Sequence, residues 1–549
     1  MNKFTSILIA LVGICISSCY EDKGDYDYNE DIRDIPVVLE TSYGVKKEKV
    51  KFSYTITPEI KVPDDYKKNL SYEWYVNTDT EYPFRKGELS GTDEKLTFEL
   101  DPDDVNMPYK YFIRLYVTDN LTGAVNMQPT TFEVIKPYTF SWMVLHEVNG
   151  HAEIGSVEYL GGSILVTPDA YTQDKGASLT GKPLSLSCKQ FETYPNTWKY
   201  SAQSIFYVTT TNEEESGILN PGNNFEMRGK WTELLHPAQR DEFFDPNNII
   251  LSGGSQGCLM TSKGKVFLSN FYSPVMYLMS QGDDVDGEYY ISKLASGPQA
   301  GVGFDEIGHR FLNLSMQNNS NWDELTYKDT PGDAGPVSLI SRNENNAIDV
   351  SQSIPTDQKI VALIPGYHYG KSGIAPWQRY TIYGYTIAGT RSHVYVFQCR
   401  GLTSGEPALP YHYDFNTPEG VDENTLMTSG NSFSNILFYA VGNKIYKLDA
   451  YTGNTTLIYQ HDDPAATIAD LKMACEGYSF NNDNDEVGTE DYGVPYNRCL
   501  GAAFNLSDGT GEMVVLQLGT NGRILEDQTK YPSTQVNRGF GKIKNIVFI

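Results

Sequence analysis

The sequence predicts an all-β protein in which a small immunoglobulin-like sandwich precedes a β-propeller of seven or eight blades. Three observations carry this prediction. The 549 residues include 39 Tyr, 48 Gly and 27 Pro, a composition typical of strands and tight turns rather than helices. Every second residue is apolar from Tyr111 to Val117, and Asp119 ends this run. Pairs of strands joined by glycine turns then recur from residue 138 to 549.

The first residues predict a leader that ends at a lipid-modified cysteine. Lys3 precedes an apolar run from Ile7 to Ile16, and two small residues stand just before Cys19. About ten apolar residues are too few for a membrane-spanning helix, which needs about 20. We therefore expect residues 1–18 to be a signal peptide and Cys19 to be the lipidated first residue of the mature chain. No later stretch is apolar enough to span a membrane.

Residues 19–34 predict an extended tether. The segment is acidic and tyrosine-rich and lacks apolar periodicity, so it should stay solvated. It resembles the acidic export signal of surface lipoproteins of Bacteroidetes. The resemblance implies a lipid-anchored protein of the outer membrane that faces the cell exterior. A plain acidic linker in a periplasmic lipoprotein is the alternative.

The net charge limits the partners of the chain. The sequence has 43 Lys and Arg against 70 Asp and Glu, a formal net charge of −27. Such a field repels nucleic acid and anionic lipid. We therefore expect no nucleic-acid partner and interpret the acidic surface as a solvated one.

The cysteines indicate neither a zinc site nor a redox site. Cys15 leaves with the leader and Cys19 takes lipid, so five remain: Cys188, Cys258, Cys399, Cys475 and Cys499. Their number is odd and their spacing is not that of metal ligands. A disulfide between Cys475 and Cys499 would suit an oxidising compartment, but buried thiols are the favoured interpretation.

Residues 35–136 predict the sandwich. Short strands are expected at 36–39, 50–56, 71–76, 96–100, 111–119 and 131–135. This number and spacing of strands are typical of an immunoglobulin-like domain. Trp74 would be the core tryptophan of the third strand.

Two strands of this region carry a family resemblance. Tyr72-Glu73-Trp74 and the alternating run from Tyr111 to Asp119 resemble the PKD domain. With the Cys-Tyr-Glu-Asp-Lys-Gly opening at Cys19, the chain is similar to the PKD-like lipoproteins of Bacteroidetes that are encoded beside SusC/SusD-type importers. The resemblance implies such an importer as a partner. The chain departs from the pattern at Met107-Pro108, where a glycine is usual.

Residues 138–549 predict the propeller. The Asn149-Gly150 hairpin opens a series of paired strands, and the stretch from Asn443 to Gly453 resembles the inner strands of a propeller blade. A blade takes about 40 to 50 residues, which gives seven or eight blades. Residues 546–549 could pair with residues 140–142 and close the ring, which removes exposed strand edges. Two or more stacked sandwiches are the alternative.

His146 and His151 invite a metalloprotease interpretation that their spacing excludes, since they lie five residues apart across a hairpin turn. Pairing of Val148 with His151 would set His146 opposite Glu153 and place the three polar side chains on one face. A shared metal ion and satisfied histidines are the alternatives, and the second is favoured. We assign no metal and no cofactor.

Other chemical motifs are weak. Acidic loops at 283–287 and 481–486 offer oxygen ligands but do not follow the order of a calcium-binding loop, so solvated turns are favoured. No nucleophile elbow, phosphate loop or dinucleotide fingerprint is present. We assign no catalytic residue, although paired carboxylates for glycoside cleavage stay an alternative.

Aromatic loops are the candidates for ligand binding. Flat rings stack on sugar faces or peptide groups, while amides and basic groups give direction to the contact. The candidates are Trp198, Trp322, Tyr367, His368, Tyr369, Trp377, Arg379 and Tyr380. The alternative for each aromatic residue is that it packs a loop.

These features favour a non-enzymatic surface lipoprotein that binds or presents a glycan or oligopeptide to a SusC/SusD-type importer. A propeller hydrolase or lyase that acts on glycan or peptide at the same location is one alternative. A scaffold that binds the importer alone is another.

Overall fold

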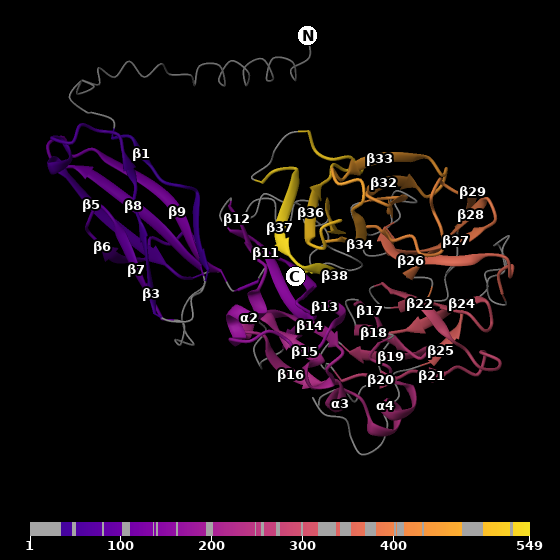
Figure 1. The fold of residues 1–549 in the computed structure, drawn as a ribbon. Helices are drawn as coiled ribbons and strands as arrows, with labels where there is room; N and C mark the ends of the chain where they lie inside the picture. Colours follow the sequence, from indigo (N-terminus) through magenta and orange to yellow (C-terminus); the bar gives the residue numbers. More distant parts are fainter. Residues whose placement is uncertain are drawn as a thin grey trace, which may run out of the picture. The chain divides into compact units, whose positions relative to one another are not determined.

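The computed structural model describes residues 35–549 with gaps. The gaps are 47–50, 80–81, 102–109, 136, 139–140, 161–162, 194–200, 248, 254–256, 271–274, 298–299, 317–335, 341–352, 368–379, 400–401, 403–410, 431–432, 475–497 and 527–530. Cys19 and the expected tether lie outside the described residues. The chain divides into two compact units, of which the first ends at Val134 and the second runs from Ile135 to Ile549 (Figure 1).

The first unit is an antiparallel sandwich. Its larger sheet has the order β2-β9-β8-β5-β6, and two strand pairs, β3-β7 and β1-β4, complete it. The strands are β1 (Val37–Val38), β2 (Ser42–Lys46), β3 (Phe52–Ile56), β4 (Glu59–Ile60), β5 (Leu70–Asn77), β6 (Glu88–Gly91), β7 (Leu96–Leu100), β8 (Lys110–Asp119) and β9 (Val125–Ile135). A short 3-10 helix, Lys67–Asn69, precedes β5.

Trp74 forms the centre of this unit, as the sequence predicts. Its side chain is 0% exposed, and its indole Nε1 donates a hydrogen bond to the Asp93 carbonyl at 2.9 Å. Every second residue of β8 is buried, which confirms the alternation from Tyr111 to Asp119. The predicted strands are present, but β2, β4 and β6 were not expected. They have two to five residues each, too few for a clear periodic pattern.

The second unit is a β-propeller. In its described residues, seven sheets follow one another along the chain, so the structure has seven blades. The first four blades, innermost strand first, are β38 (Lys542–Phe548), β10 (Ser141–Val148), β11 (His151–Leu160), β12 (Ser163–Thr167); β13 (Pro183–Thr193), β14 (Ser201–Thr210), β15 (Gly217–Asn220), β16 (Glu226–Lys230); β17 (Ile249–Gly253), β18 (Gly257–Ser262), β19 (Lys265–Asn270), β20 (Tyr277–Leu278); and β22 (Ile291–Ser296), β23 (Ala300–Asp305), β24 (Arg310–Ser315), β25 (Pro336–Leu339), β21 (Ser280–Gln281).

The last three blades have four strands each. They are β26 (Lys359–Tyr367), β27 (Tyr380–Ala388), β28 (Arg391–Gln398), β29 (Tyr411–Asn416); β30 (Met427–Thr428), β31 (Ile436–Val441), β32 (Lys444–Asp449), β33 (Thr455–Gln460); and β34 (Thr467–Met473), β35 (Cys499–Asn505), β36 (Gly511–Gln517), β37 (Thr534–Phe540). Short helices α2 (Ala170–Lys175), α3 (Trp231–Leu234) and α4 (Pro237–Phe243) lie in connections. No helix within the described ranges is long and apolar enough to cross a bilayer.

The C-terminal strand closes the ring. β38 pairs antiparallel with β10, with Val144 opposite Ile546, and backbone hydrogen bonds join Ser141 to Ile549 in both directions. This confirms the predicted pairing of the last residues with residues 141 and 142. β38 also contacts β13 on one side and β34 on the other, so the innermost strands meet around the ring (Figure 1).

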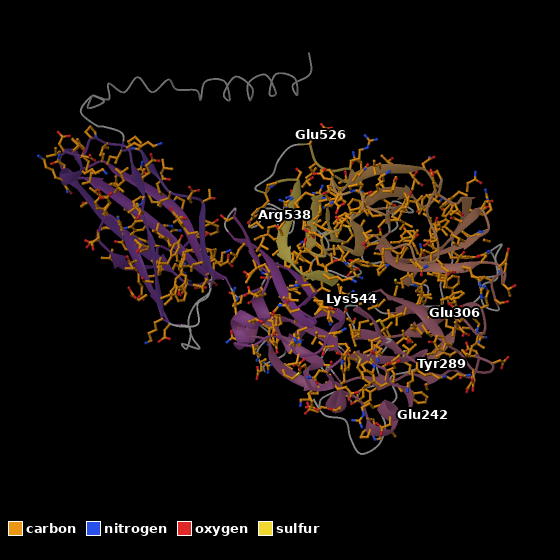
Figure 2. The ribbon with its side chains drawn as sticks, in the orientation of Figure 1. Glu242, Tyr289, Glu306, Glu526, Arg538 and Lys544 are labelled. Carbon is orange, nitrogen blue, oxygen red and sulfur yellow. The ribbon has the colours of Figure 1, made fainter. Side chains whose placement is uncertain are left out.

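Two buried carboxylates of the propeller have cationic partners. Glu512 of β36 accepts hydrogen bonds from the Arg538 guanidinium at 2.7 Å and from the His461 imidazole, which follows β33, at 3.1 Å. Asp305 of β23 accepts from the Arg310 guanidinium at 3.0 Å. Each of these acids has a cationic neighbour that offsets part of the cost of burying its charge. Arg538 is among the side chains labelled in Figure 2.

Candidate functional site

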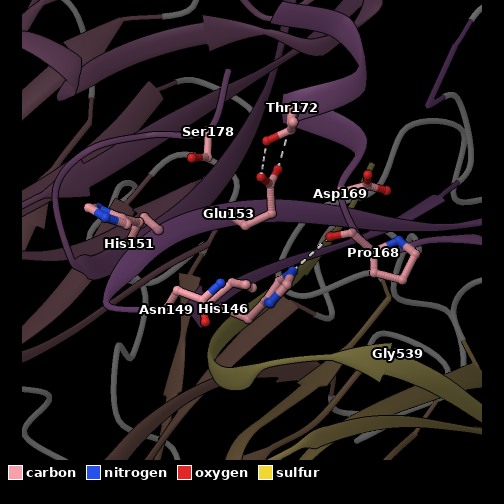
Figure 3. Close-up of a pocket in the computed structure, with 11 residues that line it drawn as sticks. His146, Asn149, His151, Glu153, Pro168, Asp169, Thr172, Ser178 and Gly539 are labelled. Carbon is pink, nitrogen blue, oxygen red and sulfur yellow. Dashed lines mark hydrogen bonds between the residues drawn. The ribbon is translucent and has the colours of Figure 1, made fainter. Parts of the chain in front are cut away.

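A cavity of about 350 Å³ opens in the first blade. It lies between the turn that joins β10 to β11 and the segment that leads from β12 into α2. Figure 3 shows its lining residues, which are His146, Val148, Asn149, His151, Ala152, Glu153, Pro168, Asp169, Thr172, Ser178 and Gly539. Most come from one hairpin and the α2 segment, whereas Gly539 comes from β37 of the last blade.

The β10–β11 hairpin places the polar side chains of the cavity. Asn149 and Gly150 form its two-residue turn with φ angles of 52° and 85°, a left-handed pair that Asn-Gly accepts readily. The turn sets Val148 opposite His151 and His146 opposite Glu153, which confirms the predicted register. Side chains two residues apart on a strand share a face. The prediction that His146, His151 and Glu153 lie on one face is therefore confirmed.

His146 is a structural histidine. Its side chain is 1% exposed, its Nδ1 accepts a hydrogen bond from the Gly541 N–H at 2.9 Å, and its Nε2 donates to the Pro168 carbonyl at 2.8 Å. Burial lowers the pKa of this imidazole, so the neutral ring is favoured. Both nitrogens are therefore engaged, which supports the satisfied-histidine interpretation over a metal ligand.

Glu153 joins β11 to α2. Its carboxylate accepts from the backbone N–H groups of Ile154 and Thr172, each at 3.1 Å, and from the Thr172 hydroxyl (Figure 3). The side chain is 4% exposed. Burial raises the pKa of the carboxyl, and the hydrogen bonds from Thr172 oppose that shift. The acid is thus held in one position by groups of the fold.

The rim of the cavity is exposed and rich in acceptors. Asp169 stands just before α2, and its carboxylate accepts from the Gln173 side chain at 2.8 Å. The His151 ring donates from Nδ1 to the Thr180 carbonyl at 2.9 Å. Ser178 lies on the same rim, near Glu153 in Figure 3. These groups are accessible to a ligand because their residues are exposed or half-buried.

Gly539 allows the last blade to approach the cavity closely. Its φ angle is 103°, and a Cβ at this position would lie 2.8 Å from Cγ of Pro168. Any side chain here would both strain the backbone and push against the cavity wall. The sequence offered no signal for this contact, because Gly539 and Pro168 are far apart in the chain.

Of the predicted ligand-binding residues, the structure describes Tyr367 and Tyr380. Trp198, Trp322, His368, Tyr369, Trp377 and Arg379 lie outside the described residues. The backbone of Tyr367 pairs with Tyr380 between β26 and β27. Tyr380 is 2% exposed and packs in a hydrophobic cluster with Ile382 and Phe397, which is the packing role that the sequence left as the alternative to ligand binding.

The structure describes the acidic loop at 283–287 and the side chains of three of the cysteines. The 283–287 loop is bonded to its own neighbours, because Asp284 accepts from the Leu339 N–H at 3.0 Å and the Gln281 amide donates to the Gly287 carbonyl. The 481–486 loop and Cys475 lie outside the described residues. Cys258, Cys399 and Cys499 are buried. In the described part of the chain, no group of three or more His, Cys, Asp or Glu side chains is arranged to hold a metal ion.

Sequence analysis did not identify the α2 segment, which supplies four of the eleven residues that line the cavity. Pro168, Asp169, Thr172 and Ser178 come from the α2 segment, which sequence reasoning did not single out. An available signal was Asp169, an acidic residue directly before a short helical stretch. The approach of this segment to β11 depends on tertiary packing and had no local signature.

The N-terminal part of the chain matches a known protein family. Residues 19–183 match the PKD-like family. The match confirms the PKD resemblance of the two strands in the first unit, which we now call the PKD-like domain. It extends into the propeller as far as the start of β13 and so includes the β10–β11 hairpin and α2.

Several solved structures resemble the whole chain or its propeller. A quinonprotein alcohol dehydrogenase-like protein of Bacteroides thetaiotaomicron is 12% identical, with 94% of this chain and 99% of that chain covered and a TM-score of 0.39. A DUF4784 family protein of Bacteroides caccae is 10% identical over 92% and 99%, with a TM-score of 0.27. The Nup133 β-propeller domain of Vanderwaltozyma polyspora is 12% identical over 66% and 97%, also at 0.27. At these scores the likenesses carry no argument about function. No curated protein matches the chain.

Proposed function

We propose that this protein is a lipoprotein of the outer-membrane surface that binds a glycan or oligopeptide through its propeller as a non-enzymatic accessory of a SusC/SusD-type uptake system. The observation that carries the binding role is the cavity of the first blade. Its volume of about 350 Å³ falls in the range of about 300 to 1,000 Å³ that small-molecule sites occupy.

The hydrogen bonds in the cavity support binding rather than catalysis. A general acid or base must exchange a proton with the substrate, and it therefore needs an atom that points to the substrate and can change its partner. Both nitrogens of His146 and both oxygens of Glu153 hold backbone or side-chain groups of the fold. Such a network keeps the cavity in shape before a ligand arrives, which lowers the entropic cost of binding.

The proposed location follows from the leader and the tether. A cysteine after a short apolar leader is the expected lipidation position, and acyl chains anchor with about 0.8 kcal/mol per buried methylene. The match of residues 19–183 to the PKD-like family begins at Cys19, which agrees with a mature chain that starts there. The importer as a partner rests on the resemblance to PKD-like lipoproteins.

Experiments on intact cells, on membrane fractions and on the purified protein test this proposal. External protease should degrade the wild-type protein without lysis, and Cys19→Ser should abolish lipid labelling and release the protein from the membrane fraction. Affinity purification from native outer membrane should then recover an importer of the SusC/SusD type. A protein that is protected from external protease, or that fractionates identically with and without Cys19, would contradict the location. Turnover of a glycan or peptide by the purified protein would contradict the non-enzymatic role.

A further inference from the structure

The cavity contains a buried carboxylate without a cationic partner. Glu153 is 4% exposed and accepts hydrogen bonds from neutral donors, namely two backbone N–H groups and one hydroxyl. Among the described residues, no Lys, Arg or His forms an ion pair with it. A buried charge is costly unless it is both hydrogen-bonded and paired. Glu153 meets the first condition and lacks the second.

Two other buried acids of the propeller have a cationic partner, whereas a third, Asp470 at 6% exposed, is held like Glu153 by neutral donors. Glu512 is 7% exposed and has the Arg538 guanidinium at 2.7 Å. Asp305 is 0% exposed and has the Arg310 guanidinium at 3.0 Å. Both acids receive their counter-charge from the chain itself. Glu153 differs from all three because it lines an open cavity, so its counter-charge can come from outside.

The charges of the cavity wall have one sign. Glu153 and Asp169 are the acids among the lining residues, which include no Lys or Arg. The negative charge of Asp169 is close enough to raise the pKa of Glu153 further, beyond the larger effect of burial. His146 adds no positive charge, because burial favours its neutral form. Carboxylates in a partly enclosed, low-dielectric space attract cations and repel anions strongly.

We propose that the cavity of the first blade binds the ammonium group of its ligand, with Glu153 and Asp169 as counter-charges. An ammonium has three N–H donors, and a carboxylate has about four acceptor positions, of which Glu153 uses three within the fold. The remaining position of Glu153, the Asp169 carboxylate and the exposed hydroxyl of Ser178 can accept from the ammonium. This inference rests on the proposed binding function and names its ligand class. An oligopeptide can present its amino terminus, and a glycan can present an amino sugar. Ligands whose only charge is a carboxylate, such as uronates, are excluded.

Glu158 provides a matched control on the same strand. It is 2% exposed, and its carboxylate accepts from the Tyr138 N–H and the Ser156 hydroxyl, each at 3.2 Å. It does not line the cavity. Glu158→Gln therefore removes a buried acid of β11 without changing the cavity wall. Asp169→Asn tests the exposed acid, whose replacement leaves the core intact.

Calorimetric titration of the full mature chain tests the proposal with two pairs of probes. One pair is trialanine and N-acetyl-trialanine, and the other is glucosamine and N-acetylglucosamine. In each pair acetylation removes the ammonium charge and keeps the rest of the molecule. We expect at least one amine to bind at least about tenfold more tightly than its acetylated partner, which corresponds to about 1.4 kcal/mol. The pair that shows the difference identifies the peptide or the amino sugar as the source of the ammonium.

The variants decide whether the cavity is responsible. Glu153→Gln and Asp169→Asn should each weaken binding of the preferred amine at least about tenfold, whereas Glu158→Gln should leave it unchanged. Equal affinities within both pairs, no binding of either amine at millimolar concentration, or wild-type affinity in both cavity variants would overturn the proposal. Binding of an acetylated probe alone would overturn it while the proposed binding function stands. Failure to co-purify an importer would contradict the proposed role in uptake, but it would not contradict amine binding by the cavity.

Discussion

The Phe548 ring of the last strand packs edge-on against the Trp142 indole of β10, with 5.2 Å between the ring centroids and an interplanar angle of 68°. Trp142 is 0% exposed and belongs to a core cluster that also contains Val515 of β36. The same indole lies so close to Gly501 of β35 that a Cβ there would be 2.6 Å from Cη2. The C-terminal strand and the first hairpin therefore share one core with the last blade.

Truncation of Ile546 tests this closure. Its side chain is 0% exposed in the shared core, so Ile546→Ala should lower the free energy of unfolding of the propeller by about 2 to 5 kcal/mol. Val536→Ala on β37 is the control, since Val536 is 42% exposed and should change stability by less than about 0.5 kcal/mol. Urea unfolding measures both values. Equal effects of the two substitutions would mean that β38 does not close the ring.

Two aromatic residues of the PKD-like domain should behave in opposite ways. Trp74 is 0% exposed at the centre of the sandwich, whereas Phe84 is 88% exposed. Trp74→Ala should cost about 3 to 5 kcal/mol, and Phe84→Ala should stay within about 0.5 kcal/mol of wild type. Calorimetric scans of the full chain would show the first change as an unfolding transition at lower temperature. A scan of Trp74→Ala that matches wild type would contradict the described core.

Replacement of Glu153 should alter how stability depends on pH. Its pKa is raised by burial, so the stabilising contribution of the protonated acid is fully present below the unfolded value of about 4.5. That contribution is lost as pH rises through the folded pKa. Without ligand, Glu153→Gln should therefore gain stability relative to wild type as pH rises from acid to neutral. Thermal midpoints measured across pH would show this trend, and a variant that is less stable at neutral pH than at low pH, relative to wild type, would contradict it.

A pair of histidines in the fifth blade should destabilise the propeller in acid. The rings of His393 and His412 stack with 5.5 Å between centroids and 12° between planes. Burial lowers the pKa of both, and for His412 the charge of His393 lowers it further. The acids near the pair are Asp414, which pairs with Arg391, and Asp357; they oppose the shift, while Arg391 adds to the lowering at His393.

The stability that the two neutral histidines contribute is fully present above their unfolded pKa of about 6.5. It is lost as pH falls below that value, because protonation then favours the unfolded state. Each unit by which a folded pKa lies below the unfolded one corresponds to about 1.4 kcal/mol. His412→Gln should therefore flatten the decline of the unfolding free energy below pH 6.5. Denaturant titrations of both proteins across this range provide the measurement, and parallel pH profiles would show that the pair does not titrate on unfolding.

The sequence predicted those features that depend on local geometry. A two-residue Asn-Gly turn has few backbone solutions, so the register that sets His146 opposite Glu153 could be read from the chain alone. The C-terminal pairing was also predictable, because a terminal apolar run and an unpaired first strand complement each other. The contacts of His146 with Pro168 and Gly541 were not, since both partners are distant from His146 in the sequence and no local pattern links them. Tyr380 was predicted to lie in a loop, but it is the first residue of β27. This strand buries consecutive residues, so it lacks the alternating pattern that would have identified it.

The most direct test of the account is to block the cavity of the first blade. Ser178 lies on its exposed rim and takes part in no core cluster, so Ser178→Trp should fill the entrance without unfolding the protein. We predict an unchanged thermal midpoint and a loss of ligand affinity of at least about tenfold for whichever probe the wild type binds. A folded Ser178→Trp protein that binds this probe with wild-type affinity would contradict the claim that this cavity is the binding site.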